Sequence, residues 1–383
     1  MGGFACAARI ARAGRRSASR HGAAEVSRWP SRIRSRVENA ACIRARAACV
    51  QAGAAASFRA VTKTQPSHTA PAPADSLARH WTARLPKRAR AFAQLSRLDR
   101  PIGWRLLYLP CLMGIALVRT QDGFWWSDGW NALLFLVGAI AMRGAGCTYN
   151  DIVDRDIDAR VARTHGRPLP SGAVNLLEAW VWLAAQALIG FLVLLALPRF
   201  AQFTALASLP LVALYPFMKR ITWWPQAFLG LVFSWGALVA GAATARALAP
   251  ETLLLYGACF FWVMGYDTIY ALQDKEDDAL VGVKSTARLF GEHWRAWTIG
   301  FYLAALLLWS AAAYVAGAQW PTFLVLGALG AFVIWPELER PQETYPASAL
   351  ASFRANALIG AAIAGALALE PLWRTLRPFL DGR

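Results

Sequence analysis

The chain has 383 residues, of which 57% are hydrophobic and only 16% are charged, and it contains 18 Trp. This composition excludes an ordinary soluble domain and indicates a protein that crosses a membrane several times. The formal net charge of +17 does not indicate nucleic-acid binding, because most of it lies in an N-terminal segment without regular aromatic or helical organisation.

Residues 1–80 form a basic N-terminal extension. They contain 13 Arg and one Lys but only three acidic residues, and Ala, Ser and Pro are frequent between them. Such a composition is typical of a mitochondrial transit peptide, and also of a disordered tail. We therefore expect the transmembrane domain to occupy residues 81–375.

Apolar windows suited to crossing a hydrocarbon core of about 30 Å recur along that domain. They lie near 104–118, 130–148, 179–197, 201–215, 226–244, 253–271, 296–316, 320–335 and 356–372. Because they are continuously apolar, they favour helices over the alternating strands of a membrane barrel. The windows 104–118 and 320–335 are shorter than the roughly 17 residues of a perpendicular span. The predicted fold is an all-α bundle of about nine transmembrane helices in a lipid bilayer.

Basic residues follow alternate windows, which predicts that these loops face the cytoplasm or the mitochondrial matrix. The basic residues on this side include Arg97, Arg100, Arg155, Arg160, Arg163, Arg167, Lys219, Arg220, Lys275, Lys284, Arg288 and Arg295. The opposite loops carry only Arg119, Arg199 and Arg246. The basic C-terminus, with Arg374 and Arg377, opposes this topology for an odd number of spans.

The stretch NDIVDRDID places polar oxygens directly after the second window. Asn150, Asp154 and Asp158 recur every four residues, so they share one face if the helix continues. Like charges at this spacing need compensation, and oxygen ligands without nearby His or Cys are typical of Mg²⁺ sites. The alternative is a solvated helix end whose acids pair with Arg155 and Arg160.

A second acidic stretch, YDTIYALQDKEDD, ends the sixth window, with Asp274 and Asp278 again four residues apart. The charge pattern puts both stretches on the same side of the membrane, which favours one shared site. Mg²⁺ is commonly held by one or two carboxylates together with substrate phosphates. A membrane site of this kind indicates an isoprenoid diphosphate, whose tail would lie along apolar helices.

Several cations could bind the diphosphate oxygens directly. Lys219 and Arg220 are the first candidates, and Lys275 and Lys284 are weaker ones. Basic loops on the inner side need no further reason than topology, so this interpretation has a plain alternative. Arg167 lies in GRPLPSG, which is either a lid near phosphate or an ordinary turn.

Two charges lie deeper along the same helices. Arg143 precedes Asn150 by seven residues, and Asp267 precedes Asp274 by seven. Charged residues inside a membrane are costly and are usually functional or paired. A structural ion pair between Arg143 and Asp267 is one interpretation.

Four stretches, in this order, carry a resemblance to a known family. They are RLDRPIGW (97–104), NDIVDRDIDARVARTHGRPLPSG (150–172), YPFMKRITWWPQAFLG (215–230) and GYDTIYALQDKEDDALVGVKSTARLFG (265–291). The chain resembles the UbiA superfamily of membrane prenyltransferases over about residues 97–370. The second and fourth stretches resemble its hydroxybenzoate-prenylating branch.

This resemblance implies a nine-span fold and a Mg²⁺-dependent enzyme. The implied reaction moves a polyprenyl group from polyprenyl diphosphate to the ring carbon ortho to the hydroxyl of 4-hydroxybenzoate, in ubiquinone biosynthesis. The Mg²⁺ ligands would be Asn150, Asp154, Asp158, Asp274 and Asp278. Asp154, Asp274 and Arg143 would be the catalytic residues. The aromatic acid would lie against Arg143, Tyr215 and Asp267, with its carboxylate on Arg143.

Two alternatives stay open at this point. A protein of the same fold could prenylate homogentisate, naphthoate or haem instead. Intramembrane charges could also belong to a cation-coupled transporter, although a transporter would place its acids near the bilayer midplane. The expected location is an inner membrane, bacterial or mitochondrial, with the site on the cytoplasmic or matrix side.

Overall fold

The computed structural model describes residues 80–159, 164–339 and 345–381. Of the basic extension expected over residues 1–80, only His80 lies in the described part. Every regular element in the described ranges is a helix, which confirms the predicted all-α class.

The helices follow one another with short connections. In chain order they are η1 (Trp81–Arg84), α4 (Lys87–Leu95), α5 (Ile102–Val118), α6 (Trp126–Asp158), α7 (Leu176–Ala196), α8 (Arg199–Leu206), α9 (Leu209–Ile221), α10 (Pro225–Ala245), α11 (Pro250–Ala271), η2 (Leu272–Asp274), α12 (Lys275–Val281), α13 (Thr286–Phe290), η3 (Gly291–His293), α14 (Trp294–Val315), α15 (Trp320–Glu339) and α16 (Tyr345–Leu380).

Seven helical segments in the described ranges are long and apolar enough to cross a bilayer. They are Trp126–Asp158, Leu176–Ala196, Arg199–Ile221, Pro225–Ala245, Pro250–Asp274, Thr286–Val315 and Ala349–Leu380. The two windows expected to be too short, 104–118 and 320–335, coincide with the shorter apolar helices Ile102–Val118 and Trp320–Trp335. Eight of the nine predicted windows coincide with one helix each, to within a residue, whereas 201–215 is divided between α8 and α9. Length and apolarity support seven spans in the described ranges.

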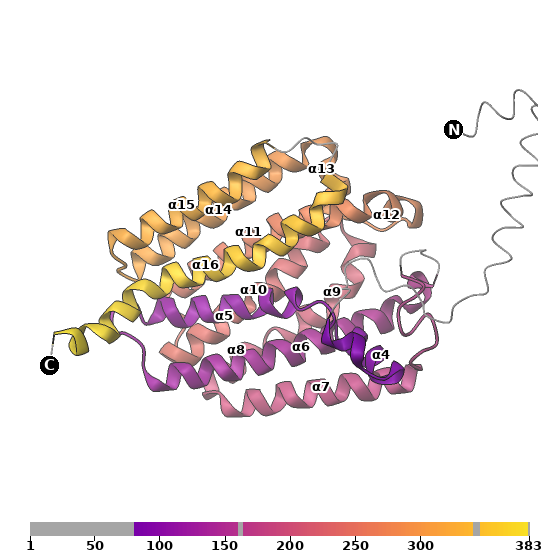
Figure 1. Cartoon of the computed structure of the whole chain (residues 1–383), viewed down its shortest axis with the longest axis horizontal. Coiled ribbons are helices and arrows are strands. Elements are labelled where there is room, and N and C mark those ends of the chain that lie inside the picture. The colour runs from indigo at the N-terminus through magenta and orange to yellow at the C-terminus, as the bar shows by residue number, and fades with distance from the viewer. Residues whose placement is uncertain (1–79, 160–163, 340–344, 382–383) are drawn as a thin grey trace, which may run out of the picture. The chain divides into compact units, whose positions relative to one another are not determined.

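The long helices lie side by side, with α7 and α15 at opposite edges of the bundle (Figure 1). The closest packing joins α11 to α14, α10 to α5 and α11, and α6 to α7. Trp262 and Tyr266 of α11 are the largest fully buried side chains in the described part. Trp262 Nε1 donates a hydrogen bond of 2.9 Å to Asn356 Oδ1, which ties α11 to α16. The main core thus centres on α11, against which α5, α10, α14 and α16 pack.

Glycines let some of these helices approach closely, as small residues do in membrane bundles. A Cβ on Gly144 of α6 would lie 1.9 Å from Gln186 Oε1 of α7, and one on Gly241 of α10 would lie 2.5 Å from Thr252 Cγ2 of α11. Gly146 is different, because a Cβ there would meet nothing within 4 Å. It lines a cavity instead.

The connection between α5 and α6 holds a buried ion pair. Arg119 Nε and Nη2 donate to the two carboxylate oxygens of Asp128 at 2.7 and 3.0 Å. Asp128 Oδ2 also accepts the backbone N–H of Trp125 at 2.8 Å, and the Trp125 ring lies under the Arg119 guanidinium. Arg119 was expected only as a loop charge. Its pairing with Asp128 fixes the start of α6.

We expect Asp128→Asn to destabilise the folded protein, because it leaves the Arg119 charge buried without a counterion. The expected loss is about 3–5 kcal/mol, measured by thermal unfolding of the detergent-solubilised protein. The matched control is Asp122→Asn, since Asp122 is exposed in the same connection. Equal unfolding temperatures for the two variants would contradict a structural role for this pair.

Candidate active site

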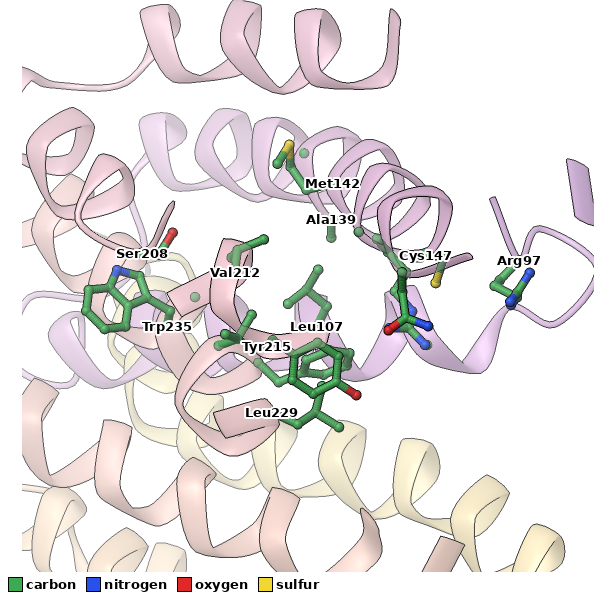
Figure 2. Close-up of a pocket in the computed structure, with 18 of the residues that line it drawn as sticks. Arg97, Leu107, Ala139, Met142, Cys147, Ser208, Val212, Tyr215, Leu229 and Trp235 are labelled. Atoms are coloured by element: carbon green, nitrogen blue, oxygen red, sulfur yellow. The ribbon is translucent and has the colours of Figure 1, made fainter. Parts of the chain in front are cut away.

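A cavity of about 510 Å³ runs between the helices of the core. Figure 2 shows Arg97 at one end and Trp235 with Ser208 at the other, with Tyr215 and Leu107 between them. The polar end is lined by Arg97, Arg100, Arg143, Asn150, Arg167, Asp267, Tyr270 and Asp274. The opposite end is lined mainly by apolar side chains of α6, α7, α9 and α10, including Phe135, Val193, Leu197, Val212 and Val239.

The length of the cavity can be followed along α6. Its lining residues run from Phe135 to Asn150, a rise of about 22 Å for a regular helix. One end can therefore hold a charged group while a long apolar chain lies in the remainder.

Helix α6 continues to Asp158, as the spacing of the first acidic stretch predicts. Asn150 reaches the cavity, whereas Asp154 and Asp158 are buried in ion pairs. Asp154 Oδ1 accepts from Arg220 Nη2 at 3.0 Å, and Asp154 Oδ2 accepts from Lys219 Nζ. The expected partners Arg155 and Arg160 do not provide this compensation, because Arg155 pairs with Asp156 and Arg160 lies outside the described residues.

Asp158 is compensated by a cation from the following loop. Arg167 Nη1 donates to Asp158 Oδ2 at 2.6 Å. The same nitrogen lies 3.3 Å from Asp151 Oδ1. Arg167 also lines the cavity, from a segment of turns and bends over residues 164–174.

The second acidic stretch reaches the same cavity through Asp274, the last residue of η2. Asp278 lies one turn further on, in α12, where its backbone oxygen accepts from Val283 N–H at 2.9 Å. Asn150 and Asp274 thus face one cavity from two helices. This is the convergence that the sequence predicted for the two stretches.

Two of the lysines that were expected to bind diphosphate interact with protein groups instead. Lys275 Nζ is 3.9 Å from Glu292 Oε1, and Lys284 Nζ donates to the Ile221 carbonyl at 2.9 Å. The backbone N–H of Lys284 also donates to the Lys219 carbonyl at 2.9 Å. This bond joins the last turn of α9 to the segment that follows α12.

The sequence RLDRPIGW contributes two arginines to the site that were not predicted there from sequence. They were used only to infer the orientation of the helices in the membrane. Arg97 and Arg100 both line the polar end. Arg97 Nη2 donates to Asp151 Oδ1 at 2.6 Å, and the Asp151 side chain is fully buried. Burial is the largest single influence and acts to lower the pKa of Arg97, but the charge and hydrogen bond of Asp151, together with other nearby groups such as Asp99, outweigh it; the pKa is raised, so Arg97 stays charged. The position of Arg97 and Arg100 in the first of the four family-like stretches could have identified them from sequence.

Arg143 lies deeper in the cavity than Asn150, two turns back along α6. Its guanidinium carbon is 5.1 Å from the centre of the Phe233 ring, and its buried Nε has no hydrogen-bond partner among the described residues. A Cβ on Gly103 would lie 2.5 Å from that nitrogen, so glycine leaves the room that Arg143 occupies. Asp267 and Tyr215 line the same cavity.

The expected ion pair between Arg143 and Asp267 is not formed in the part of the chain that the structure describes. Both charges instead face the cavity from opposite helices. That arrangement leaves the Arg143 guanidinium available for a ligand.

Within the described ranges, no three His, Cys, Asp or Glu side chains lie close enough together to hold one metal ion. Asn150 and Asp274 remain oxygen donors that line one cavity. Mg²⁺ needs few protein ligands when substrate phosphates and water complete its shell. The donors present are therefore compatible with Mg²⁺ bound together with a phosphate ligand.

Curated relatives match most of this region. A mitochondrial 4-hydroxybenzoate polyprenyltransferase of Aedes aegypti is 46% identical over 241 residues, which cover 63% of this chain and 54% of that protein. The Drosophila melanogaster protein of the same name is 47% identical, covering 64% and 62%. The human one is 40% identical, covering 76% and 77%. The chain thus spans little more than half the length of the first insect relative.

Solved structures share the fold. A UbiA homologue from Aeropyrum pernix K1, without ligand, has a TM-score of 0.54 and 27% identity, over 68% of this chain and 96% of that one. A UbiA homologue from Archaeoglobus fulgidus, bound to GPP and Mg²⁺, has a TM-score of 0.53 and 19% identity, over 73% and 99%. The second likeness concerns the fold alone.

The UbiA prenyltransferase family matches this sequence over residues 107–363, from the middle of α5 into α16. This match covers well over half of the chain and includes both acidic stretches. The chain therefore belongs to the UbiA prenyltransferase family.

Proposed function

We propose that this protein transfers a polyprenyl group from polyprenyl diphosphate to the ring carbon ortho to the hydroxyl of 4-hydroxybenzoate, in ubiquinone biosynthesis. One observation carries the proposal: a single cavity joins a cationic and acidic end to a long apolar channel. The relatives named for this reaction, at 40–47% identity, support the choice of substrates. GPP and Mg²⁺ in the Archaeoglobus fulgidus homologue support the metal and the prenyl diphosphate.

The proposed Mg²⁺ ligands are the five residues expected from sequence, with Asn150 and Asp274 as those that already face the cavity. When bound, Mg²⁺ would neutralise charge on the diphosphate leaving group and so favour cleavage of the allylic C–O bond. Asp154 and Asp158 carry compensated charges before any ligand arrives. We propose that diphosphate gives Lys219 and Arg167 a new anionic partner and thereby frees these two carboxylates for the metal.

Arginine is well suited to the leaving group, because its planar fork can bind two phosphate oxygens at once. Arg97, Arg100 and Arg167 all line the polar end of the cavity. Lys219 pairs with Asp154 and does not line the cavity, so it would have to leave that partner to reach the leaving group. Lys275 and Lys284 would first have to leave Glu292 and the Ile221 carbonyl.

The aromatic acid is proposed to lie deeper than the diphosphate. Its carboxylate would receive two hydrogen bonds from Arg143, whose Nε has no partner in the described part of the chain. Tyr215 and Asp267 line the cavity beside it. This placement brings the electron-rich ring carbon toward the allylic carbon at the polar end of the channel.

Aromatic walls suit the positive charge that develops on the allylic carbon. Phe233, Tyr266 and Phe353 line the cavity, and ring faces attract cations. The apolar lining also keeps water from reacting with that carbon. The new C–C bond forms as the C–O bond to diphosphate breaks, and the ring then loses a proton to restore aromaticity.

We place the protein in the mitochondrial inner membrane. The seven long apolar helical segments within the described ranges make it a multi-pass membrane protein. The relatives are mitochondrial proteins, and the composition of residues 1–80 is typical of a transit peptide.

The direct test is an acceptor assay with membranes that contain the full chain. We expect Mg²⁺-dependent formation of prenylated product from a polyprenyl diphosphate and 4-hydroxybenzoate, and little product when homogentisate or a naphthoate replaces it. Product from one of those acceptors alone would refute the proposed substrate, and no product with any acceptor would refute the reaction.

We expect Asp154→Asn and Asp274→Asn each to reduce turnover below about a tenth, a barrier increase above about 1.4 kcal/mol. Each change removes a charge from the proposed metal site. The control is Asp156→Asn on the same helix, because the Asp156 side chain is 79% exposed. More than a tenth of the activity in either test variant, with normal protein in the membrane, would count against the ligand set.

Arg143→Ala should raise the apparent KM for 4-hydroxybenzoate far more than the apparent KM for the prenyl diphosphate. Removing one partner of a buried charge pair costs on the order of 2–5 kcal/mol. Lys219→Ala serves as the comparison, because it should raise the apparent KM for the prenyl diphosphate more than the apparent KM for 4-hydroxybenzoate. A normal level of Arg143→Ala protein with an unchanged KM for hydroxybenzoate would show that Arg143 does not bind the acid.

A further inference from the structure

Asp151 has no role in the proposed reaction, although it follows Asn150 directly in the chain. Its side chain is fully buried, and Oδ1 receives hydrogen bonds from Arg97 Nη2 at 2.6 Å and from Arg167 Nη1 at 3.3 Å. Both arginines line the cavity, whereas Asp151 does not. The carboxylate therefore lies behind two guanidinium groups that face the cavity.

The backbone at Arg97 gives a second, independent observation. Helix α4 ends in a Schellman motif, in which Leu98 N–H donates to the Ala93 carbonyl at 2.9 Å and Arg97 N–H donates to the Gln94 carbonyl at 3.0 Å. This motif puts Arg97 at φ +54°, in the left-handed region. Glycine is the residue usually found there, because a Cβ is strained at such a φ.

An arginine at this position costs conformational energy that a glycine would avoid. The gain lies in its side chain, which is held at both ends of the guanidinium. Nη1 donates to the Gln94 carbonyl at 2.8 Å, and Nη2 donates to Asp151. Such strain at a ligand cavity is typical of a residue whose orientation matters for binding.

We propose that Asp151 is a positioning residue, which holds Arg97 and Arg167 in place to receive the anionic end of the prenyl substrate. This inference rests on the proposed function. Two guanidinium groups in one poorly solvated site repel each other, and the shared carboxylate offsets that repulsion. The forks are then oriented before the diphosphate arrives, so less ordering is needed on binding.

The competing role for Asp151 is metal ligation. It neighbours Asn150, and its buried Oδ2 has no hydrogen-bond partner in the described part of the chain. The two roles differ in what they predict for Mg²⁺. A positioning residue acts on the affinity for the diphosphate, whereas a ligand acts on the affinity for the metal.

Asp151→Asn in the full chain separates these roles. The apparent KM for the prenyl diphosphate should rise on the order of tenfold, as when a supporting partner is lost. The apparent KM for 4-hydroxybenzoate and the Mg²⁺ concentration for half-maximal rate should stay within about twofold of the native values. A raised Mg²⁺ requirement, or an unchanged KM for the prenyl diphosphate, would overturn the proposal.

Arg97→Gly provides a variant that the fold should accept, since glycine relieves the strained backbone at that position. Relief of the backbone strain offsets part of the cost of leaving the buried Asp151 carboxylate with Arg167 alone, so we expect folded protein in the membrane together with a raised KM for the prenyl diphosphate. Asp151→Asn should then have a smaller effect in the Arg97→Gly background than alone, because the two residues are coupled. Full additivity, or normal prenyl diphosphate binding by Arg97→Gly, would contradict the proposal.

Asp128→Asn is the matched control, because Asp128 also forms a buried ion pair with an arginine but lies at the opposite end of α6. It should lower the amount of folded protein while leaving each KM of the remaining enzyme unchanged. If the native chain forms no product at all, the proposed function fails. If it forms product and Asp151→Asn retains the native KM for the prenyl diphosphate, only the role of Asp151 fails.

Discussion

Charge compensation in a poorly solvated interior is the constraint on which this site depends. A buried carboxylate or guanidinium loses its hydration and is tolerated only beside an opposite charge or strong hydrogen-bond partners. The structure meets this need with chains of alternating sign, in which Asp154 lies between Lys219 and Arg220, and Asp151 lies between Arg97 and Arg167. An anionic substrate and a cation can enter such an arrangement together, because their opposite charges largely cancel. The ion pairs of the site can then exchange partners without leaving a buried charge uncompensated.

The same constraint explains the division of the cavity. Charged groups gather where α6, α9 and η2 end, so that the last turn of α9 and the flanking loops supply the counterions, while the rest of the cavity is lined mainly by apolar side chains. Arg143 and Asp267 are the exceptions within the spans. They lie two helical turns deeper than Asn150 and Asp274. The channel therefore offers a polar environment for the acceptor beside an apolar environment for the donor's chain.

Sequence alone predicted the helices from local patterns, and it put the two acidic stretches on one side of the membrane from the distribution of basic residues between the spans. Eight of the nine apolar windows coincide with one helix each, and the ninth, 201–215, is divided between α8 and α9. The four-residue spacing to Asp158 correctly extended α6. Pairing over long distances was beyond that reasoning. Lys219 is 65 residues from Asp154, and no periodicity in the chain connects them. Arg97 was missed for a related reason, since the left-handed turn that presents it becomes evident only in the folded backbone.

Helix α5, which lines the cavity from Ile102 to Cys111, has 17 residues. A regular helix of that length rises about 26 Å, which is less than the roughly 30 Å of a typical hydrocarbon core. Ten of the 17 residues of α5 are buried among neighbouring helices, so the difference in length is met inside the protein rather than by the lipid beside it. Water and lipid headgroups can then come closer to the polar end of the cavity than they could above a full-length span. A diphosphate can therefore reach Arg97 and Asn150 with a shorter passage through hydrocarbon, while its prenyl tail never has to leave the apolar phase.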